Sequence, residues 1–175
     1  EALQFLNSTE SSNEDIFKIL GTIPDPEMPI SITDLGLIED VFYDDTTIRV
    51  TVLPTFIGCF ALPTIAKEIE QKLSALEGIT SVEVNFIHDP PWSIDRITNE
   101  GRASLAQHGI SVPDSGAICC QEGETEVVEL RTSAIPCPWC QSRETTITSP
   151  FGPTRCKSIH FCNACRQPFE RMKRV

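Results

Sequence analysis

Four cysteines near the end of the chain are spaced as the ligands of one metal ion. They form two C-x-x-C pairs, Cys137 with Cys140 and Cys162 with Cys165. A C-x-x-C turn brings two sulfurs within reach of one ion, and two such turns complete a tetrahedron of four thiolates. The spacing therefore predicts a closed structural site, which leaves no open coordination position for catalysis.

Zinc is the metal that this set of thiolates favours, with rubredoxin-like iron and a thiolate-held cluster as the alternatives. The residues between the two pairs alternate in polarity and are interrupted by Pro150, Gly152 and Pro153. They predict a strand–loop–strand ribbon. A segment of this length buries too little surface to fold alone, whereas a structural zinc supplies roughly 10–16 kcal/mol. We therefore expect the metal to be part of the ribbon's fold.

Other residues of the ribbon either compete with these ligands or form its core. Cys156 belongs to neither pair and is expected to be packed or exposed. His160 is a substitute ligand, but its spacing fits less well than that of the four cysteines. The small core of the ribbon is expected to consist of its aromatic side chains, Trp139, Phe151 and Phe161.

A solitary cysteine, Cys59, follows a predicted strand and precedes a predicted helix in "VLPTFIGCFALPTIAKEI". A thiol at this position faces unpaired backbone N–H groups, which favour the thiolate. Gly58 allows the backbone to approach a bound group closely. Cys59 is thus a candidate nucleophile or transient metal ligand. The alternative is a small buried hydrophobe, packed between Ile57 and Phe60.

Carboxylates in a proline-rich stretch are weaker candidates for a site. Asp25, Glu27 and Asp34 could form a cluster, but an Asp in such turns commonly supports the backbone by hydrogen bonds. The Asp-Pro-Pro-Trp run at 89–92, which follows His88, either lies at the edge of a site or forms a rigid corner anchored by its indole.

Composition and charge limit the classes of function. The chain has 175 residues, 40% hydrophobic and 22% charged, which is ordinary for a globular protein. Residues 131–175 carry eight Lys/Arg and two acids, whereas residues 1–130 carry six and 23. The acidic body opposes nucleic-acid binding, although the basic ribbon alone would suggest it. We expect a cytoplasmic protein with reduced cysteines and no membrane anchor, because no apolar run reaches spanning length and the first residues lack a secretory pattern.

The elements that must position these residues form an α+β domain over residues 1–111. Helices are predicted over 13–21, within 61–78 with Gly78 as the C-cap, and within 93–110 with Gly109 as the stop signal. A hairpin turning at 44–46 and a strand over 79–87 make a small mixed sheet, covered on one face by the helices. Residues 112–132, which include Cys119 and Cys120, predict a linker with a short strand at 126–130. Residues 133–175 form the ribbon.

Two stretches, "DPEMPISITDLGLIEDV" and "PTFIGCFALPTIAKEIE", resemble the iron–sulfur cluster assembly domain family related to SufT. Together with "DPPWSIDRITNEGRASLAQHGI" and the cysteine pairs, they resemble a family of small accessory subunits of bacterial phenylacetyl-CoA epoxidase (ring 1,2-monooxygenase) complexes. The resemblance covers nearly the whole chain. This chain departs from it at Phe60, where Pro is common, and at Gln141, where Gly is common.

The resemblance implies a non-catalytic accessory protein of aerobic phenylacetate degradation, which matures or delivers the iron or iron–sulfur centre of the oxygenase or reductase subunit. Cys59 matches the cysteine of the family's assembly domain, and Asp25, Pro26 and Glu27 match its acidic-proline signature, which makes Cys59, Asp25 and Glu27 the candidates for iron or cluster transfer. The two C-x-x-C pairs match the ligands of the family's ribbon, Cys137, Cys140, Cys162 and Cys165. A cluster needs more than one cysteine, so Cys59 would act from two copies of a homodimer or together with thiols of a client. The alternatives are a structural adaptor that holds the oxygenase complex together and a general iron–sulfur assembly factor.

Overall fold

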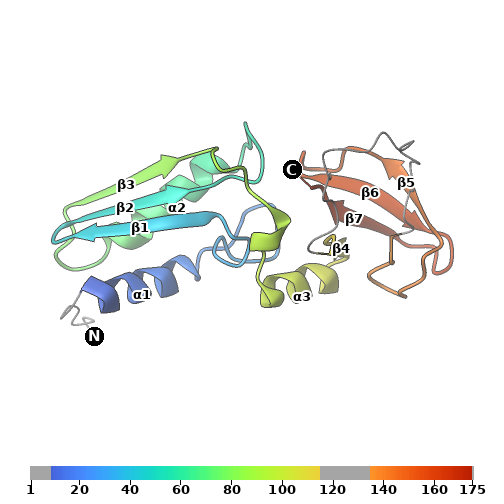
Figure 1. Cartoon of the computed structure of the whole chain (residues 1–175), viewed down its shortest axis with the longest axis horizontal. Coiled ribbons are helices and arrows are strands. Elements are labelled where there is room, and N and C mark those ends of the chain that lie inside the picture. The colour runs from blue at the N-terminus through green and yellow to red at the C-terminus, as the bar shows by residue number, and fades with distance from the viewer. Residues whose placement is uncertain (1–8, 115–134, 175) are drawn as a thin grey trace, which may run out of the picture. The chain divides into compact units, whose positions relative to one another are not determined.

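The computed structural model describes residues 9–114 and 135–174, with the side chains of the first helix described from residue 13 onward. The chain divides into two compact units, the first ending at Leu105 and the second running from Ala106 to Arg174 (Figure 1). The predicted strand at 126–130 and the cysteine pair 119–120 lie outside the described residues. Of the helices in the described residues, none is long and apolar enough to cross a membrane.

The first unit contains a three-stranded mixed sheet. Its strands are β1 (Ile38–Asp44), β2 (Thr47–Val52) and β3 (Ser81–Phe86), in the order β1-β2-β3. β1 is antiparallel to β2 and is joined to it by the predicted tight turn, whereas β2 is parallel to β3. Because Val52 lies opposite Phe86 in the parallel pair, the loops that follow β2 and β3 leave the same edge of the sheet. The small mixed sheet expected from the sequence is confirmed.

Two helices cover one face of this sheet (Figure 1). α1 (Thr9–Leu20) contacts β1, α2 (Leu62–Ser74) contacts β3, and the two helices contact each other. In α2 the buried residues recur every four positions, and in β2 every second residue is buried, as a covered helix and a half-covered strand require. These core side chains are Ile65, Ile69, Leu73, Ile48, Val50 and Val52.

The C-terminal end of α2 differs from the prediction. The helix ends at Ser74 and its C-cap is Ala75, which keeps a right-handed conformation with φ −78° and ψ −7°. No left-handed residue is therefore needed at the helix end. Gly78, with φ +87°, lies in the turn that leads to β3, so its assignment as the C-cap was wrong.

The helix predicted within 93–110 is shorter and is preceded by a separate turn. A 3₁₀ turn, η1 (Ile94–Arg96), precedes α3 (Asn99–Gln107). The Thr98 hydroxyl oxygen accepts a hydrogen bond from the Gly101 N–H at 3.0 Å, which satisfies one of the donors at the start of α3. Gly109 follows the helix with φ +75°, as the prediction of a stop signal requires.

The second unit is a four-stranded sheet in the order β4-β7-β6-β5. Its strands are β4 (Ile110–Ser111), β5 (Thr145–Ser149), β6 (Lys157–Cys162) and β7 (Pro168–Met172). β6 is antiparallel to β5 and to β7, and β4 is parallel to β7. The prediction of two strands was therefore incomplete. The unit also includes residues 106–111, which were expected to belong to the first domain.

The core of the ribbon is not the aromatic set expected from the sequence. Trp139 and Phe151 are 50% and 68% exposed, Phe161 is partly buried, and the aromatic ring in the core is that of Phe169. Phe169 packs with two buried cysteines, Cys137 and Cys162. The metal-binding residues thus occupy the position that a larger domain would fill with apolar side chains, which explains why so few aromatics are buried.

Candidate functional site

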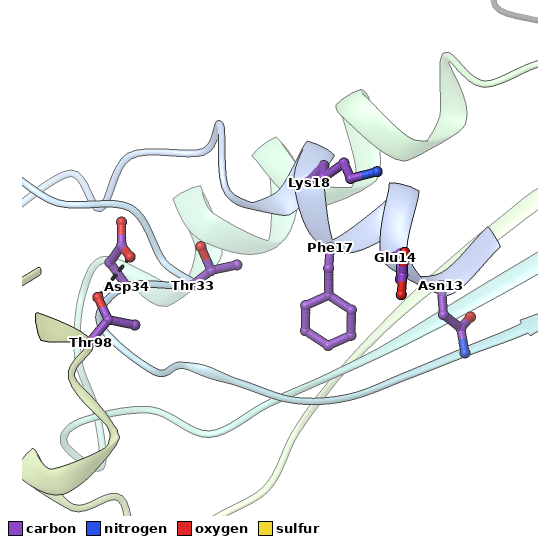
Figure 2. Close-up of a pocket in the computed structure, with 7 residues that line it drawn as sticks. All are labelled: Asn13, Glu14, Phe17, Lys18, Thr33, Asp34 and Thr98. Atoms are coloured by element: carbon purple, nitrogen blue, oxygen red, sulfur yellow. Dashed lines mark hydrogen bonds between the residues drawn. The ribbon is translucent and has the colours of Figure 1, made fainter. Parts of the chain in front are cut away.

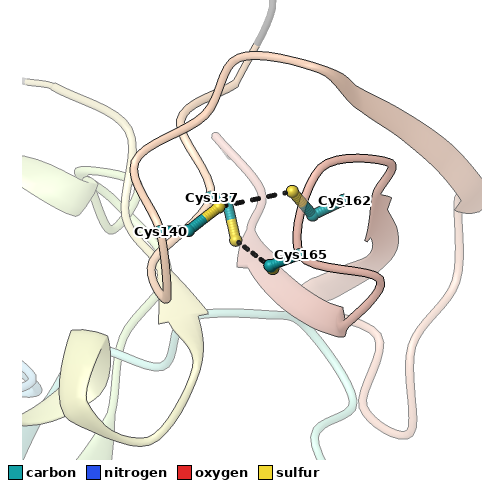
Figure 3. Close-up of side chains that lie close together, drawn as sticks. All are labelled: Cys137, Cys140, Cys162 and Cys165. Atoms are coloured by element: carbon teal, nitrogen blue, oxygen red, sulfur yellow. Dashed lines mark hydrogen bonds between the residues drawn. The ribbon is translucent and has the colours of Figure 1, made fainter.

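The four cysteines of the two C-x-x-C pairs converge on one point in the ribbon (Figure 3). The Sγ atoms of Cys137 and Cys165 are 3.7 Å apart, those of Cys140 and Cys162 are 3.6 Å apart, and all four lie within 4.8 Å of one another. A tetrahedron with Zn–S bonds of 2.3 Å has sulfur–sulfur edges of about 3.8 Å. These separations are too long for disulfides, whose sulfurs lie about 2.05 Å apart. The quartet therefore fits a structural zinc ion.

The two halves of this centre have the same backbone geometry. In the first, the Gln141 N–H donates to the Cys137 carbonyl at 2.9 Å; in the second, the Arg166 N–H donates to the Cys162 carbonyl at 3.0 Å. Gln141 and Arg166 both have positive φ, 62° and 61°. A residue in the left-handed conformation thus follows each of the two pairs. Each turn directs its two sulfurs to the same side.

The two thiols of the second C-x-x-C pair differ in pKa. Backbone N–H groups, that of Cys165 foremost, lower the pKa of the Cys162 thiol to about 7. Burial, followed by the neighbouring Cys140 thiol, raises the pKa of Cys165 to about 12. The protein alone thus ionises one of these two thiols readily and holds the other protonated. A divalent ion supplies the charge that lets all four sulfurs bind as thiolates.

His160 and Cys156, the other ribbon residues that could bind a metal, make contacts outside the cluster of four sulfurs. His160 is buried, stacks on Phe169 with 5.4 Å between ring centroids, and has its Nε2 3.0 Å from the Ser158 hydroxyl. Cys156 is also buried, with its sulfur 3.2 Å from the Thr154 hydroxyl. Neither residue belongs to the sulfur cluster found among the described residues.

Cys59 lies in the loop between β2 and α2, and its surroundings contradict the packed alternative. The cysteine is half-buried, while Ile57 and Phe60 on either side of it are 71% and 86% exposed. Gly58 has φ +81°, a conformation that glycine adopts without strain. Apart from its two chain neighbours, no described residue has a heavy atom within 4 Å of the place where a Cβ would be. The thiol is therefore presented on an open loop and is not sealed in the core.

Two of the predicted carboxylates, Glu27 and Asp25, lie near the Cys59 thiol and make different contacts. The Cys59 thiol is 3.9 Å from Oε2 of Glu27, close enough for a weak hydrogen bond from the thiol to the carboxylate. Asp25 is 9% exposed, and its Oδ1 accepts a hydrogen bond from the Glu27 N–H at 2.8 Å. Asp25 thus fixes the turn that carries Glu27, and Glu27 is the carboxylate that faces the thiol.

The third carboxylate, Asp34, is hydrogen-bonded to residues other than Cys59 and Glu27. It accepts hydrogen bonds from the Ser31 hydroxyl at 2.7 Å and from the Thr98 hydroxyl at 2.8 Å, which tethers its loop to the start of α3. Asp34 and Thr98 also line an open hollow of about 640 Å³ beside α1 (Figure 2). None of the residues that line this hollow is Cys59 or Glu27. We assign the hollow no role in the chemistry.

The Asp-Pro-Pro-Trp run forms the rigid corner that the sequence suggested. Trp92 is 2% exposed, and its Nε1 donates to the Leu35 carbonyl at 3.1 Å. Sequence reasoning missed another tryptophan contact. The Trp139 ring packs over Gly109, where an added Cβ would lie 2.3 Å from Cζ2, and its Nε1 donates to the Pro168 carbonyl at 3.3 Å. No periodicity could have signalled this contact, since β4 is only two residues long.

Comparison with known proteins assigns the two parts of the chain to two families. The model of the PaaD zinc beta ribbon domain matches residues 121–173, and the model of an iron–sulfur cluster assembly protein matches residues 13–86. In structure, the chain is similar to a domain of unknown function, DUF59, from Bacillus anthracis. The TM-score is 0.53 at 30% identity, over 55% of this chain and 92% of the other.

Relatives in sequence cover either the whole chain or its first part. The Fe-S protein maturation auxiliary factor YitW of Bacillus subtilis (strain 168) is 32% identical over 97 residues, 55% of this chain and 95% of the relative. A putative 1,2-phenylacetyl-CoA epoxidase subunit of Escherichia coli (strain K12) is 36% identical over 160 residues, 91% of each chain. This second match spans both units. The chain therefore belongs to the PaaD family of 1,2-phenylacetyl-CoA epoxidase subunits.

Proposed function

We propose that this protein is an accessory subunit of the phenylacetyl-CoA epoxidase system in the cytoplasm. It takes part in aerobic phenylacetate degradation and delivers iron or an iron–sulfur cluster to the oxygenase or the reductase subunit. Similarity to an epoxidase subunit and to iron–sulfur maturation factors supports an accessory, non-catalytic role. The observation that carries the finer proposal is the 3.9 Å approach of the Cys59 sulfur to Glu27 on an open loop, apart from the closed quartet.

The two sulfur environments suit different tasks. Four thiolates that enclose one ion leave no coordination position for exchange, so the quartet holds zinc and builds the ribbon. When Cys59 is deprotonated, its sulfur and the Glu27 carboxylate offer two anionic ligands to one iron, and the remaining positions stay open. Delivery is then a ligand exchange: a client thiolate displaces the Cys59 thiolate, which takes up a proton. The oxidation state of the iron is unchanged.

Co-expression of the Cys59→Ser variant with the oxygenase and reductase subunits tests the proposal. We expect the iron and acid-labile sulfide content of one of these subunits to fall at least about threefold, with the zinc content of the variant unchanged. Glu27→Gln should lower the same content to a smaller degree. Glu83→Gln is the matched control, because Glu83 is an exposed carboxylate paired with Arg49. If both subunits contain as much iron and sulfide with the Cys59→Ser variant as with the unmodified protein, the delivery role is refuted.

The second candidate function is a structural adaptor that holds the oxygenase complex together, and the specific observation behind it is the ribbon's charge. Residues 131–175 carry eight Lys/Arg and two acids, which suits contact with an acidic subunit. An adaptor with no delivery role keeps its partners and their metal content when Cys59 is replaced. Pull-down of the oxygenase and reductase with the Cys59→Ser variant, followed by metal analysis, separates the two functions.

A general iron–sulfur assembly factor differs from the proposed accessory protein in the range of its clients. Its loss would lower the activity of cytoplasmic iron–sulfur enzymes that have no part in phenylacetate degradation. Aconitase activity, measured in cells with and without the protein, provides that comparison. Unchanged aconitase with a lowered reductase cluster content supports the dedicated role.

A further inference from the structure

The loop that carries Cys59 holds the two most exposed large hydrophobic side chains of the described residues. Phe60 is 86% exposed and Ile57 is 71% exposed. Each is within two positions of the thiol, and the loop at 54–61 contains no charged residue. Burial of such side chains stabilises a folded protein, so leaving both of them exposed is unfavourable for the isolated protein. Apolar surface of this kind beside a reactive group is typical of a protein-binding site.

Two other strongly exposed aromatic rings, those of Phe42 and Phe151, have local partners. The guanidinium carbon of Arg49 lies 5.6 Å from the ring centroid of Phe42. The Nζ of Lys173 lies 4.4 Å from the ring centroid of Phe151. Cation–π contacts of this kind account for those rings. Among the described residues, neither a ring contact nor a cation contact is found for Phe60.

We propose that the Cys59 loop, defined as residues 54–61, docks a client surface that is basic around an apolar pocket and carries cysteine thiols. Ile57 and Phe60 enter the pocket, and the client's thiols face Cys59. This inference rests on the proposed function and names the partner of the same site. The client is the oxygenase or reductase subunit that receives the iron or cluster.

The requirement for client thiols follows from the ligand count. A cluster held by protein thiolates typically needs four ligands, and the loop supplies Cys59 with Glu27 beside it. Residues 1–105 contain no other cysteine. The missing ligands must therefore come from outside this unit. A surface that brings them has to be held against the loop while exchange occurs, which the two apolar side chains achieve.

The requirement for a basic partner follows from charge. Residues 1–130 carry 23 acids and six Lys/Arg, so a second copy would bring two strongly acidic bodies together at this loop. Like charges at an interface oppose association, whereas a basic surface around the pocket is attracted to it. The charge distribution therefore favours a client over self-association.

The test is the affinity of the Ile57→Ser/Phe60→Ser variant for the cluster-free reductase subunit and, separately, for the oxygenase subunit. We expect the affinity for one of them to fall at least tenfold relative to the unmodified protein. The control is Ile147→Ser/Phe151→Ser, which removes two exposed apolar side chains from the ribbon and should bind normally. Affinity of the unmodified protein should also fall as salt rises from 50 to 300 mM. Both double variants carry surface changes only, so folding is expected to be intact.

Two outcomes overturn the inference. The first is normal affinity of the loop variant for both subunits. The second is a dimer of the unmodified protein in sedimentation equilibrium that dissociates in the loop variant, which assigns the surface to a second copy. The proposed function fails separately: Cys59→Ser then leaves client iron and sulfide unchanged, whatever the affinities. A loop variant that binds normally while Cys59→Ser lowers client content refutes only the docking surface.

Discussion

Gln141 and Arg166 occupy equivalent positions in the two metal-binding turns, each directly after the second cysteine of its pair. Their φ angles are 62° and 61°, and each N–H donates to the carbonyl of the first cysteine of the same pair. Both are ordinary L-residues in a left-handed conformation, which costs roughly 1–2 kcal/mol per residue. The ribbon keeps this strain because the turn is what points two sulfurs at one ion.

Replacing either residue by glycine should therefore stabilise the zinc-bound ribbon. We expect Gln141→Gly and Arg166→Gly each to raise the free energy of unfolding by about 0.5–1 kcal/mol, since glycine relieves the strain but adds entropy to the unfolded chain. Asn163 lies in the second turn, together with Arg166, but does not have a positive φ. Asn163→Gly should therefore lower the free energy of unfolding. The measurement is chemical denaturation with saturating zinc. Equal effects of the three substitutions would contradict the strain assignment.

Removal of the metal should unfold the ribbon and leave the first unit folded. The hydrophobic cluster at the metal-binding end of the ribbon is small: Cys137, Cys162 and Phe169 are buried, with Ile135 and Cys165 partly buried against them. Zinc supplies roughly 10–16 kcal/mol to domains of this kind. The first unit has its own apolar core, so we expect it to stay folded without the metal.

The two tryptophans report on the two units separately. Trp92 is buried in the first unit and Trp139 lies in the first C-x-x-C pair. With a strong chelator, we expect the fluorescence of a Trp92→Phe variant, which reports Trp139, to change. The fluorescence of a Trp139→Phe variant, which reports Trp92, should stay constant. If the fluorescence of both variants changed at the same chelator concentration, the two units would unfold together, which would contradict this prediction.

The contact between Trp139 and Gly109 should be sensitive to a single methyl group. In Gly109→Ala, the new Cβ would lie 2.3 Å from the indole, at a residue with φ +75°. We expect a loss of at least about 2 kcal/mol, from strain and overpacking together. Gly78→Ala is the control, since Gly78 has φ +87° with nothing within 4 Å of the added atom. It should lose only about 1 kcal/mol.

A double-mutant cycle checks the cause of that difference. Trp139→Ala removes the ring that the new methyl group meets. The double variant with Gly109→Ala should therefore recover part of the loss, measured as a positive coupling in the free energy of unfolding. Additive losses would show that strain alone, and not contact with the ring, destabilises Gly109→Ala.

The sequence was sufficient for features set by local spacing. The C-x-x-C spacing predicted two turns that each present two sulfurs, and the helix face of Ile65, Ile69 and Leu73 follows from its period of four. The mixed three-stranded sheet was likewise readable from alternation and turn residues. Helix ends were less predictable: a C-cap can remain right-handed, as Ala75 does, and Gly78 is then not used as the cap.

Features that depend on tertiary contact were missed or misjudged. β4 is two residues long and exists only because β7 lies alongside it. Phe60 and Ile57 look like core residues by type, and only the path of their loop shows that they face outward. Phe151 was expected inside the ribbon on the same basis, but the thiolate centre, and not an aromatic core, holds the ribbon together. In each case the residue type alone was a poor guide to burial.

The central claim is that one sulfur exchanges metal while four do not, and metal analysis tests it most directly. The purified protein and its Cys59→Ser variant would be incubated with excess Fe²⁺ under anaerobic conditions, passed over a desalting column and analysed for zinc and iron. We predict about one zinc per chain in both, resistant to brief EDTA treatment. Sub-stoichiometric iron should be present in the unmodified protein, removed by EDTA and absent from the variant. Iron retained equally by both proteins, or iron in place of zinc in the quartet, would contradict the account.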